Sequence, residues 1–143
     1  MKIIEVIENK KQYLDLLLLA DEQEDMIDRY IDKGTMYVLD DNGVKSECIV
    51  TDEGNGIIEI KNIATVPDYQ GNGYAKALID FLVKEYGGKY SVLQVGTGDS
   101  PLTVPFYEKC GFRRIADTAR LLDGTVTSRL GTYEYEIDPP EVV

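Results

Sequence analysis

The chain has 143 residues, a formal net charge of −11 and no histidine, and hydrophobic residues make up 43% of it. This length predicts a single domain, residues 1–143, that buries a hydrophobic core. The missing histidine excludes Ser-His-Asp and Cys-His catalysis and most zinc sites, and the acidity argues against nucleic acid as a partner.

Two further features concern the compartment of the protein. No apolar run approaches the roughly 20 residues that a membrane-spanning helix needs, and the first five residues are typical of a strand and not of a signal peptide. Cys48 and Cys110 lie far apart and form no CxxC pair, which favours reduced thiols over a disulfide. We therefore expect a cytoplasmic protein with no membrane partner.

The N-terminal segment combines a strand pattern with two helical patterns. Residues 2–7 alternate as a strand does, residues 10–20 and 21–32 carry apolar stripes at helical spacing, and Gly34 ends the second helix. The carboxylates of the second helix have two interpretations, contact with a polyamine-like or lysine-like substrate and a simple solvated face. They are Asp21, Glu22, Glu24, Asp25 and Asp28.

Three strands follow, which we place at residues 35–39, 44–51 and 57–65. Asn42-Gly43 predicts a tight hairpin turn between the first two, because this pair adopts the positive φ that such turns need. Three consecutive antiparallel strands followed by a crossover helix indicate an α+β fold with a mixed sheet.

The turn after the third strand contains Gly71 and Gly73 on either side of Asn72, where a helix to Tyr86 should begin. Glycines there let the backbone approach a ligand closely, and the free N–H groups of a helix N-terminus attract an anion. The pattern predicts a phosphate cradle, although two glycines one residue apart also occur in ordinary turns. It is neither a Walker motif nor a Rossmann fingerprint, because Lys76 stands in place of the third glycine.

The C-terminal part predicts three more strands and a short helix. The strand at residues 89–95 should run parallel to the strand at 57–65, because a long helix connects them. Ser100 is a good N-cap for the short helix, with Pro101 at its first position and Pro105 in its first turn, and Gly111 ends it. Strands follow at 112–119 and 132–137, residues 120–131 give no clear pattern, and residues 139–143 are expected to form a loose tail.

Two segments resemble the GNAT family of acyl-CoA-dependent N-acetyltransferases. Residues 70–75, Gln-Gly-Asn-Gly-Tyr-Ala, resemble that family's Gln/Arg-x-x-Gly-x-Gly/Ala signature, and residues 106–112, Phe-Tyr-Glu-Lys-Cys-Gly-Phe, resemble its Tyr-x-x-x-Gly-Phe element. The resemblance covers most of the chain. It implies a mixed sheet of about seven strands flanked by about four helices, with two strands splayed apart to admit the acyl-pantetheine arm.

The resemblance also implies acetyl-CoA as the acyl donor, with no metal. Backbone N–H groups of the glycine turn should hold the diphosphate, and Lys76 either adds a charge or simply faces solvent. Ser100 stands where many relatives have an asparagine, which puts that contact in doubt. The implied cofactor-binding residues are Ile63, Ala64, Val66, Gln70, Gly71, Asn72, Gly73, Tyr74, Ala75, Lys76 and Ser100.

Acetyl transfer to an amine requires a base for the amine and an acid for the departing thiolate. Glu59 resembles the general-base glutamate of some members, and Tyr107 matches the tyrosine near the CoA sulfur. Strict alternation would place Glu59 on one face of its strand with Lys61 and Ile63. The alternatives are a salt-bridged Glu59, with Lys61 as its partner, and a Tyr107 that only packs in the core.

We therefore expect an N-acetyltransferase that moves acetyl from acetyl-CoA to a primary amine of a small molecule or a protein by direct attack in a ternary complex. The alternatives are a regulatory module of the same fold that binds acyl-CoA without turnover, and a nucleotide-binding protein of another fold. The acidic composition either attracts a cationic amine or only keeps the protein soluble. The sequence leaves the acceptor open, as it does the choice between monomer and homodimer.

Overall fold

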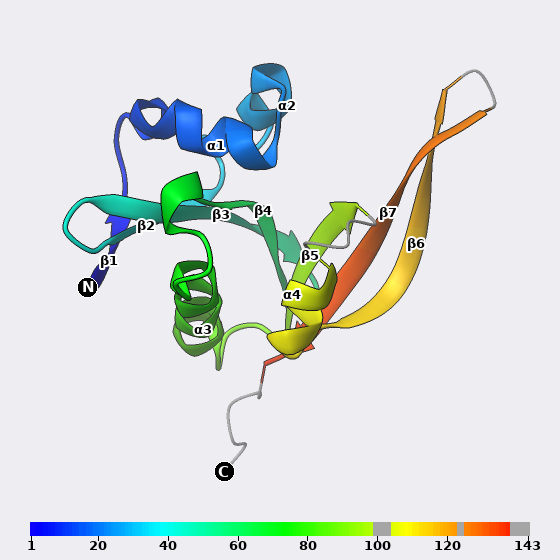
Figure 1. Cartoon of the computed structure of the whole chain (residues 1–143). Coiled ribbons are helices and arrows are strands. Elements are labelled where there is room, and N and C mark those ends of the chain that lie inside the picture. Colours follow the sequence, from blue (N-terminus) through cyan, green and yellow to red (C-terminus); the bar gives the residue numbers. More distant parts are fainter. Residues whose placement is uncertain (99–103, 123–124, 138–143) are drawn as a thin grey trace, which may run out of the picture.

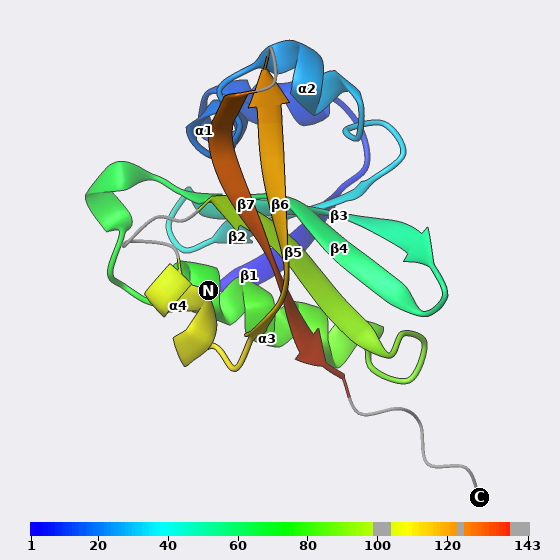
Figure 2. The ribbon, with the colours of Figure 1, turned by 90° about the vertical axis from the view of Figure 1, so that its right-hand side faces the viewer.

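The computed structural model describes residues 1–98, 104–122 and 125–137, and for residues 97, 98, 116–122 and 125–130 only the course of the backbone. These residues form one seven-stranded sheet with α1 and α2 on one face and α3 and α4 on the other (Figures 1 and 2). The strands are β1 (Lys2–Val6), β2 (Thr35–Asp40), β3 (Val44–Gly54), β4 (Ile57–Thr65), β5 (Val92–Gly98), β6 (Arg113–Leu122) and β7 (Thr125–Glu136). The helices are η1 (Lys10–Tyr13), α1 (Leu14–Ala20), α2 (Glu24–Asp28), η2 (Pro67–Tyr69), α3 (Tyr74–Tyr86) and α4 (Val104–Lys109).

The sheet has the order β1-β2-β3-β4-β5-β7-β6, and β4-β5 is its one parallel pair among the described strands. The expected mixed sheet with antiparallel strands before the crossover helix is thereby confirmed, as is the turn at Asn42 and Gly43, where both residues have positive φ. No helix among the described residues is long and apolar enough to cross a membrane.

The two N-terminal helices are shorter than their patterns predict. The first opens as a 3₁₀ turn and becomes α-helical only at Leu14, and the second is regular only over Glu24–Asp28. A five-residue helix rich in like charges gains little on its own, so packing of Ile27 and Ile31 against the sheet holds this segment. Gly34 is required where the segment returns, because a Cβ there would lie 2.6 Å from Cγ2 of Ile49.

Two hydrophobic clusters lie on the two faces of the sheet. The cluster under α3 and α4 includes Ile58, Ile60, Leu78, Leu82 and Tyr107, and the cluster under α1 and α2 includes Leu17, Ile27, Met36, Val38 and Ile49. Side chains of a strand that belong to different clusters therefore point to opposite faces.

A β-bulge in β4 changes the expected alternation. Ile49 pairs with Asn62 but the next residue of β3, Val50, pairs with Ile60, so Lys61 is the extra residue. Ile63 consequently packs with Ile58 and Ile60 against the α3 side. The prediction that Ile63 shares a face with Glu59 was wrong, because a bulge inverts the alternation beyond it.

The parallel pairing of β4 and β5 is short. It joins Ile57–Ile60 to Val92–Val95, and the rest of β4, up to Thr65, pairs with β3 alone. The two strands diverge beyond that point (Figure 1). The expected separation of these strands is therefore present.

The C-terminal strands are longer than expected. Residues 120–122 and 125–131, which belong to the segment without a clear pattern, contribute to a long antiparallel pair of β6 and β7. Mutual pairing of the two strands stabilises residues whose side-chain pattern alone does not indicate a strand. Pro105 lies in the first turn of α4 as expected, whereas the predicted cap at Ser100, Pro101 and the tail at 139–143 lie outside the described residues.

Candidate active site

The glycine turn before α3 leaves its backbone N–H groups available. Gly71 and Gly73 both have a φ of 84°, a left-handed conformation that favours glycine, while a Cβ on either would meet no atom within 4 Å. Among the described residues, no hydrogen bond is formed by the N–H of Gly71, Asn72 or Gly73. Helix α3 has no side-chain N-cap and no acidic residue in its first turn. The turn is thus built to donate hydrogen bonds to an anionic group.

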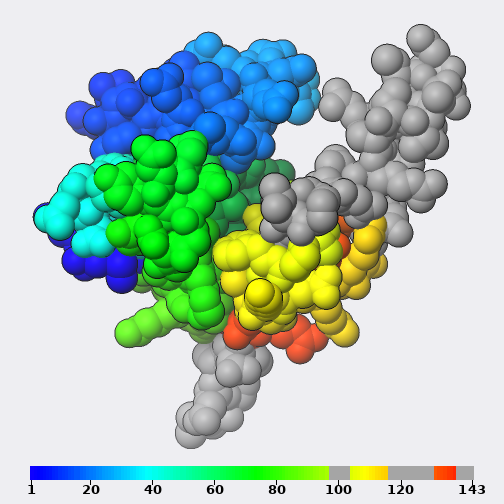
Figure 3. Space-filling model, in the orientation of Figure 1, coloured from blue at the N-terminus to red at the C-terminus, as the bar shows by residue number. Residues whose placement is uncertain are grey.

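Two side chains, those of Gln70 and Tyr74, hold this turn in place. Gln70 donates from Nε2 to the carbonyl of Thr65 at 3.4 Å, and Tyr74 donates from its hydroxyl to Oδ2 of Asp41 at 2.7 Å. Lys76 forms an ion pair with Asp80 at 2.9 Å, so its charge is already engaged on the surface of α3. The turn and α3 lie beside α4 on one face of the molecule (Figure 3).

The end of β4 leads from the gap, where β4 and β5 diverge beyond Ile60 and Val95, to the glycine turn. Ile63 packs toward α3 and Ala64 is half-buried. Val66 is less available than expected, because its N–H donates to the carbonyl of Lys45 and its own carbonyl accepts from Tyr69, both at 2.9 Å. Only the second lone pair of that carbonyl remains for a ligand.

Tyr107 lies in α4 on the α3 side of the sheet and is 5% exposed. Its ring contacts Phe106 and Phe112 edge-on and stacks with Tyr133. Burial raises the pKa of its hydroxyl well above the ordinary value of 10, so the group keeps its proton at neutral pH. Gly111 ends the helix at a φ of 99°, and a Cβ there would lie 2.9 Å from the ring of Tyr135, which explains the glycine in the Tyr-x-x-x-Gly-Phe element.

Glu59 lies on the opposite face and both of its carboxylate oxygens have partners. Gln94 donates to Oε1 at 2.8 Å, and Lys61 forms an ion pair with Oε2. Lys61 also pairs with Glu53 at 2.7 Å, which lowers the pKa of Glu53 to about 2. The alternative of a salt-bridged Glu59 is therefore present in the structure, and the side chain stays 14% exposed.

The structure does not bring Glu59 and Tyr107 into direct contact. Glu59 pairs with Thr51 in the register of β3 and β4 and shares the face of α1 and α2, whereas Tyr107 belongs to the cluster under α3 and α4. A group held in the gap between β4 and β5 would be approached by one candidate from each face. Ser100, a further predicted site residue, lies outside the described residues.

Sequence reasoning missed two buried polar residues, Asn62 in the part of β4 that no longer pairs with β5 and Glu47 on the adjacent β3. They are 2% and 0% exposed, respectively, and face α1 and α2. Neither carboxylate oxygen of Glu47 has a hydrogen-bond partner, nor does Oδ1 of Asn62. A carboxylate within the run Ser46-Glu47-Cys48-Ile49-Val50 was the available signal, since a central strand rarely buries an unpaired charge.

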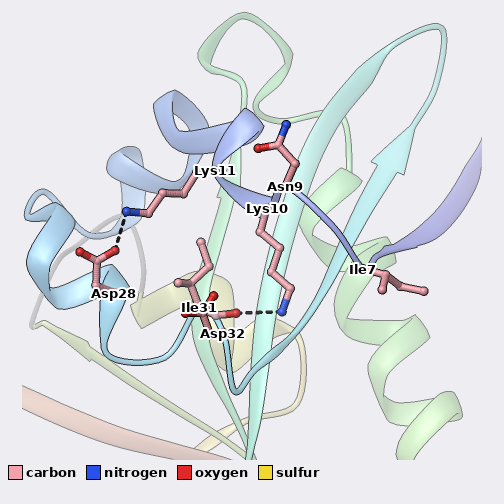
Figure 4. Close-up of a pocket in the computed structure, with 7 residues that line it drawn as sticks. All are labelled: Ile7, Asn9, Lys10, Lys11, Asp28, Ile31 and Asp32. Atoms are coloured by element: carbon pink, nitrogen blue, oxygen red, sulfur yellow. Dashed lines mark hydrogen bonds and ion pairs between the residues drawn. The ribbon is translucent and has the colours of Figure 1, made fainter.

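An open hollow of about 430 Å³ lies elsewhere, beside Lys10 and Lys11 (Figure 4). Lys10 donates to the carbonyls of Ile31 and Gly34, and Lys11 pairs with Asp28 and Glu24. These ammonium groups already hold α2 and the segment after it against η1, so we assign the hollow a structural role.

Known proteins are similar to this chain in both sequence and fold. A family model described as an acetyltransferase (GNAT) domain matches residues 32–114. An uncharacterized N-acetyltransferase of Bacillus subtilis, YvbK, is 31% identical over 109 residues, which cover 74% of this chain and 70% of the relative. The chain also superposes on an IAA acetyltransferase from Bacillus cereus, with 29% identity, a TM-score of 0.79, and coverage of 94% of this chain and 99% of the other. A GNAT family acetyltransferase from Elizabethkingia anophelis with acetyl-CoA bound gives 25% identity and a TM-score of 0.81, covering 94% and 97% of the two chains.

Proposed function

The chain belongs to the GNAT acetyltransferase family, and on this premise we propose that it moves an acetyl group from acetyl-CoA to a primary amine by direct attack in a ternary complex. The single observation that carries this proposal is the gap between β4 and β5, which opens beside a glycine turn with unbonded N–H groups. The gap suits a narrow acyl-pantetheine arm and the turn suits a diphosphate. The free thiols of Cys48 and Cys110 support a reducing, cytoplasmic compartment for the protein.

Attack requires a neutral amine, so a base must take a proton from the ammonium form. We assign this role to Glu59, whose position on the α1 and α2 face is fixed by Gln94 and Lys61. Each carboxylate oxygen still has a lone pair free to accept a proton. The amine nitrogen then bonds to the carbonyl carbon of the thioester while the carbon–sulfur bond breaks.

Tyr107 protonates the departing sulfur from the other face of the sheet. Its buried hydroxyl keeps its proton at neutral pH, which is the state that an acid needs. The phenolate left behind regains a proton from the nitrogen of the new amide bond, and Glu59 releases its own proton to solvent. The products are the N-acetylated amine and free CoA.

Thermal unfolding with CoA, acetyl-CoA, ATP and NAD tests the donor site. We expect a rise in the unfolding midpoint with both CoA species and none with NAD, because a ligand that binds only the folded state stabilises it. No stabilisation by either CoA species would contradict the proposal.

Release of free thiol in the presence of a panel of amines separates an enzyme from an acyl-CoA-binding regulatory module. We expect Tyr107→Phe to lower kcat by roughly 10²-fold or more, because it removes the proton donor and keeps the ring. Binding of CoA should be unchanged. A variant with the wild-type rate would leave Tyr107 as a core aromatic only.

A further inference from the structure

Glu47 is the only carboxylate in the buried set of the described side chains. It lies opposite Val38 on β2 and opposite Ala64 on β4, in the part of β4 that no longer pairs with β5. Both oxygens lack a donor. A buried carboxylate without a partner is costly, so such a residue in a central strand needs an explanation.

Asn62 supplies a third acceptor on the same face. Its Nδ2 donates to the carbonyl of Leu17 and to the hydroxyl of Tyr30, both at 3.0 Å, and Tyr30 in turn donates to Asp21. Because the Leu17 carbonyl can only accept, the amide orientation is determined and Oδ1 is the unpaired atom. Glu47 and Asn62 are diagonal neighbours across β3 and β4, a separation of about 7–8 Å that a glutamate side chain can span.

With Glu47 ionised, the three unpaired atoms are all acceptors, and none of them has a hydrogen-bond partner among the described residues. An ammonium group carries three N–H donors and a positive charge, so it matches this set in number and in sign. A water molecule would bring two donors and no charge. One carboxylate and one amide are too few ligands for a calcium ion.

The surroundings of Glu47 leave its charged form uncompensated. Burial raises the pKa of Glu47 well above 4.5, and it also raises the pKa values of Tyr30, Tyr107 and Cys48, the titratable groups that feel the charge of Glu47. No lysine or arginine among the described side chains offsets that charge. The chain as a whole carries a net charge of −11, which attracts cations to the entrance.

The ammonium held by Glu47 is a different group from the nitrogen that reacts. A carboxylate favours the charged form of a bound amine, whereas attack on a thioester requires the neutral form. Glu59 offers a second carboxylate on the same face of the sheet. Glu47 is therefore suited to a bound ammonium group and Glu59 to the amine that reacts.

We propose that the acceptor is a diamine or a longer polyamine, one end of which reacts near Glu59 while the other is held as an ammonium by Glu47 and Oδ1 of Asn62. This inference rests on the proposed acetyl transfer and names its acceptor class. Glu47 is closed to solvent in the free protein. The second ammonium group of the diamine therefore reaches it only when the Glu47 side chain, or the layer of α1 and α2 that covers it, shifts.

Calorimetric titration of the CoA-bound protein measures the binding without turnover. The probes are putrescine and cadaverine, with butylamine and pentylamine as monoamines of equal chain length. We expect the diamines to bind at least about ten-fold more tightly to the wild type, because only they can fill the second position. Glu47→Gln should abolish this preference.

Glu53→Gln is the matched control. Glu53 lies on the same strand as Glu47 but is paired with Lys61, and its substitution by Gln removes the same charge. It should keep the diamine preference. Equal affinity for diamines and monoamines, or a preference that survives Glu47→Gln, would overturn the inference, whereas loss of CoA binding would contradict only the proposed transfer. The comparison of diamines with monoamines is made on the wild type, so a misfolded variant cannot produce its result.

Discussion

Two carboxylates on the same face of the sheet have opposite surroundings. Glu59 is partly accessible and both of its oxygens are engaged by Gln94 and Lys61, whereas Glu47 is fully buried and neither of its oxygens has a partner. The first arrangement fixes a charged side chain in one geometry. The second leaves hydrogen-bonding capacity for a donor from outside. The difference shows that the partners of a carboxylate, more than its residue type, decide what it can bind or accept.

The largest expected effect is a loss of kcat when Glu59, the carboxylate paired with Gln94 and Lys61, is substituted. Glu59→Gln removes the proposed base and should lower kcat by roughly 10²–10⁴-fold, the usual contribution of a positioned general base. The affinity for acetyl-CoA should not change, because Glu59 lies away from the glycine turn. Steady-state thiol release and thermal shift measure the two quantities.

Glu53→Gln serves as the control for this variant. It removes one of the two carboxylates paired with Lys61 and leaves Glu59 and Gln94 in place. If Glu59→Gln and Glu53→Gln have the same small effect on kcat, the base lies elsewhere.

In the free protein, Glu47 should mainly affect how the free energy of unfolding depends on pH. Burial raises the folded-state pKa of Glu47 above the unfolded value of about 4.5, so the folded state binds the proton more tightly. The associated stability is fully present below pH 4.5 and is lost as the pH rises through the folded pKa. The wild type should therefore lose about 1.4 kcal/mol per pH unit relative to Glu47→Gln in that window.

Urea unfolding of the two proteins at a series of pH values tests this expectation. The variant should equal or exceed the wild type in stability at neutral pH, because a neutral amide replaces a buried unpaired acid. A difference that does not vary with pH would mean that Glu47 has the same pKa in the folded and unfolded states.

The smallest effect should come from the ion pair beside Glu59. Lys61 lowers the pKa of Glu53 to about 2, so the stability from this pair is present above pH 4.5 and is lost as the pH falls toward 2. Both side chains are about one-third exposed, and solvent therefore limits the contribution to roughly 1 kcal/mol or less. Lys61→Met should reduce stability at pH 7 and have little effect near pH 2, as followed by circular dichroism. An equal loss at both pH values would indicate lost packing of the lysine stem and not a lost ion pair.

Local patterns predicted most of the fold. Strand β4 occupies the predicted residues, α3 begins directly after the glycine turn and ends at the predicted Tyr86, and the turn at Asn42-Gly43 follows from the positive φ of that pair. The strands β6 and β7 extend further than predicted, because their stability comes from each other and not from a clear alternation. The bulge at Lys61 was also beyond the sequence, since a single extra residue in β4 is defined only by its pairing with β3.

The sequence by itself determined the family, the glycine turn and the parallel crossover, because these depend on backbone preferences of a few residues close together in the chain. Gly71 and Gly73 adopt the left-handed conformation that their residue type permits. Only the tertiary structure decided the surroundings of the two carboxylates. Glu59 is paired because Gln94 on β5 and Lys61 at the bulge of β4 reach it. Glu47 is unpaired because the fold buries it and brings no hydrogen-bond partner to it among the described residues.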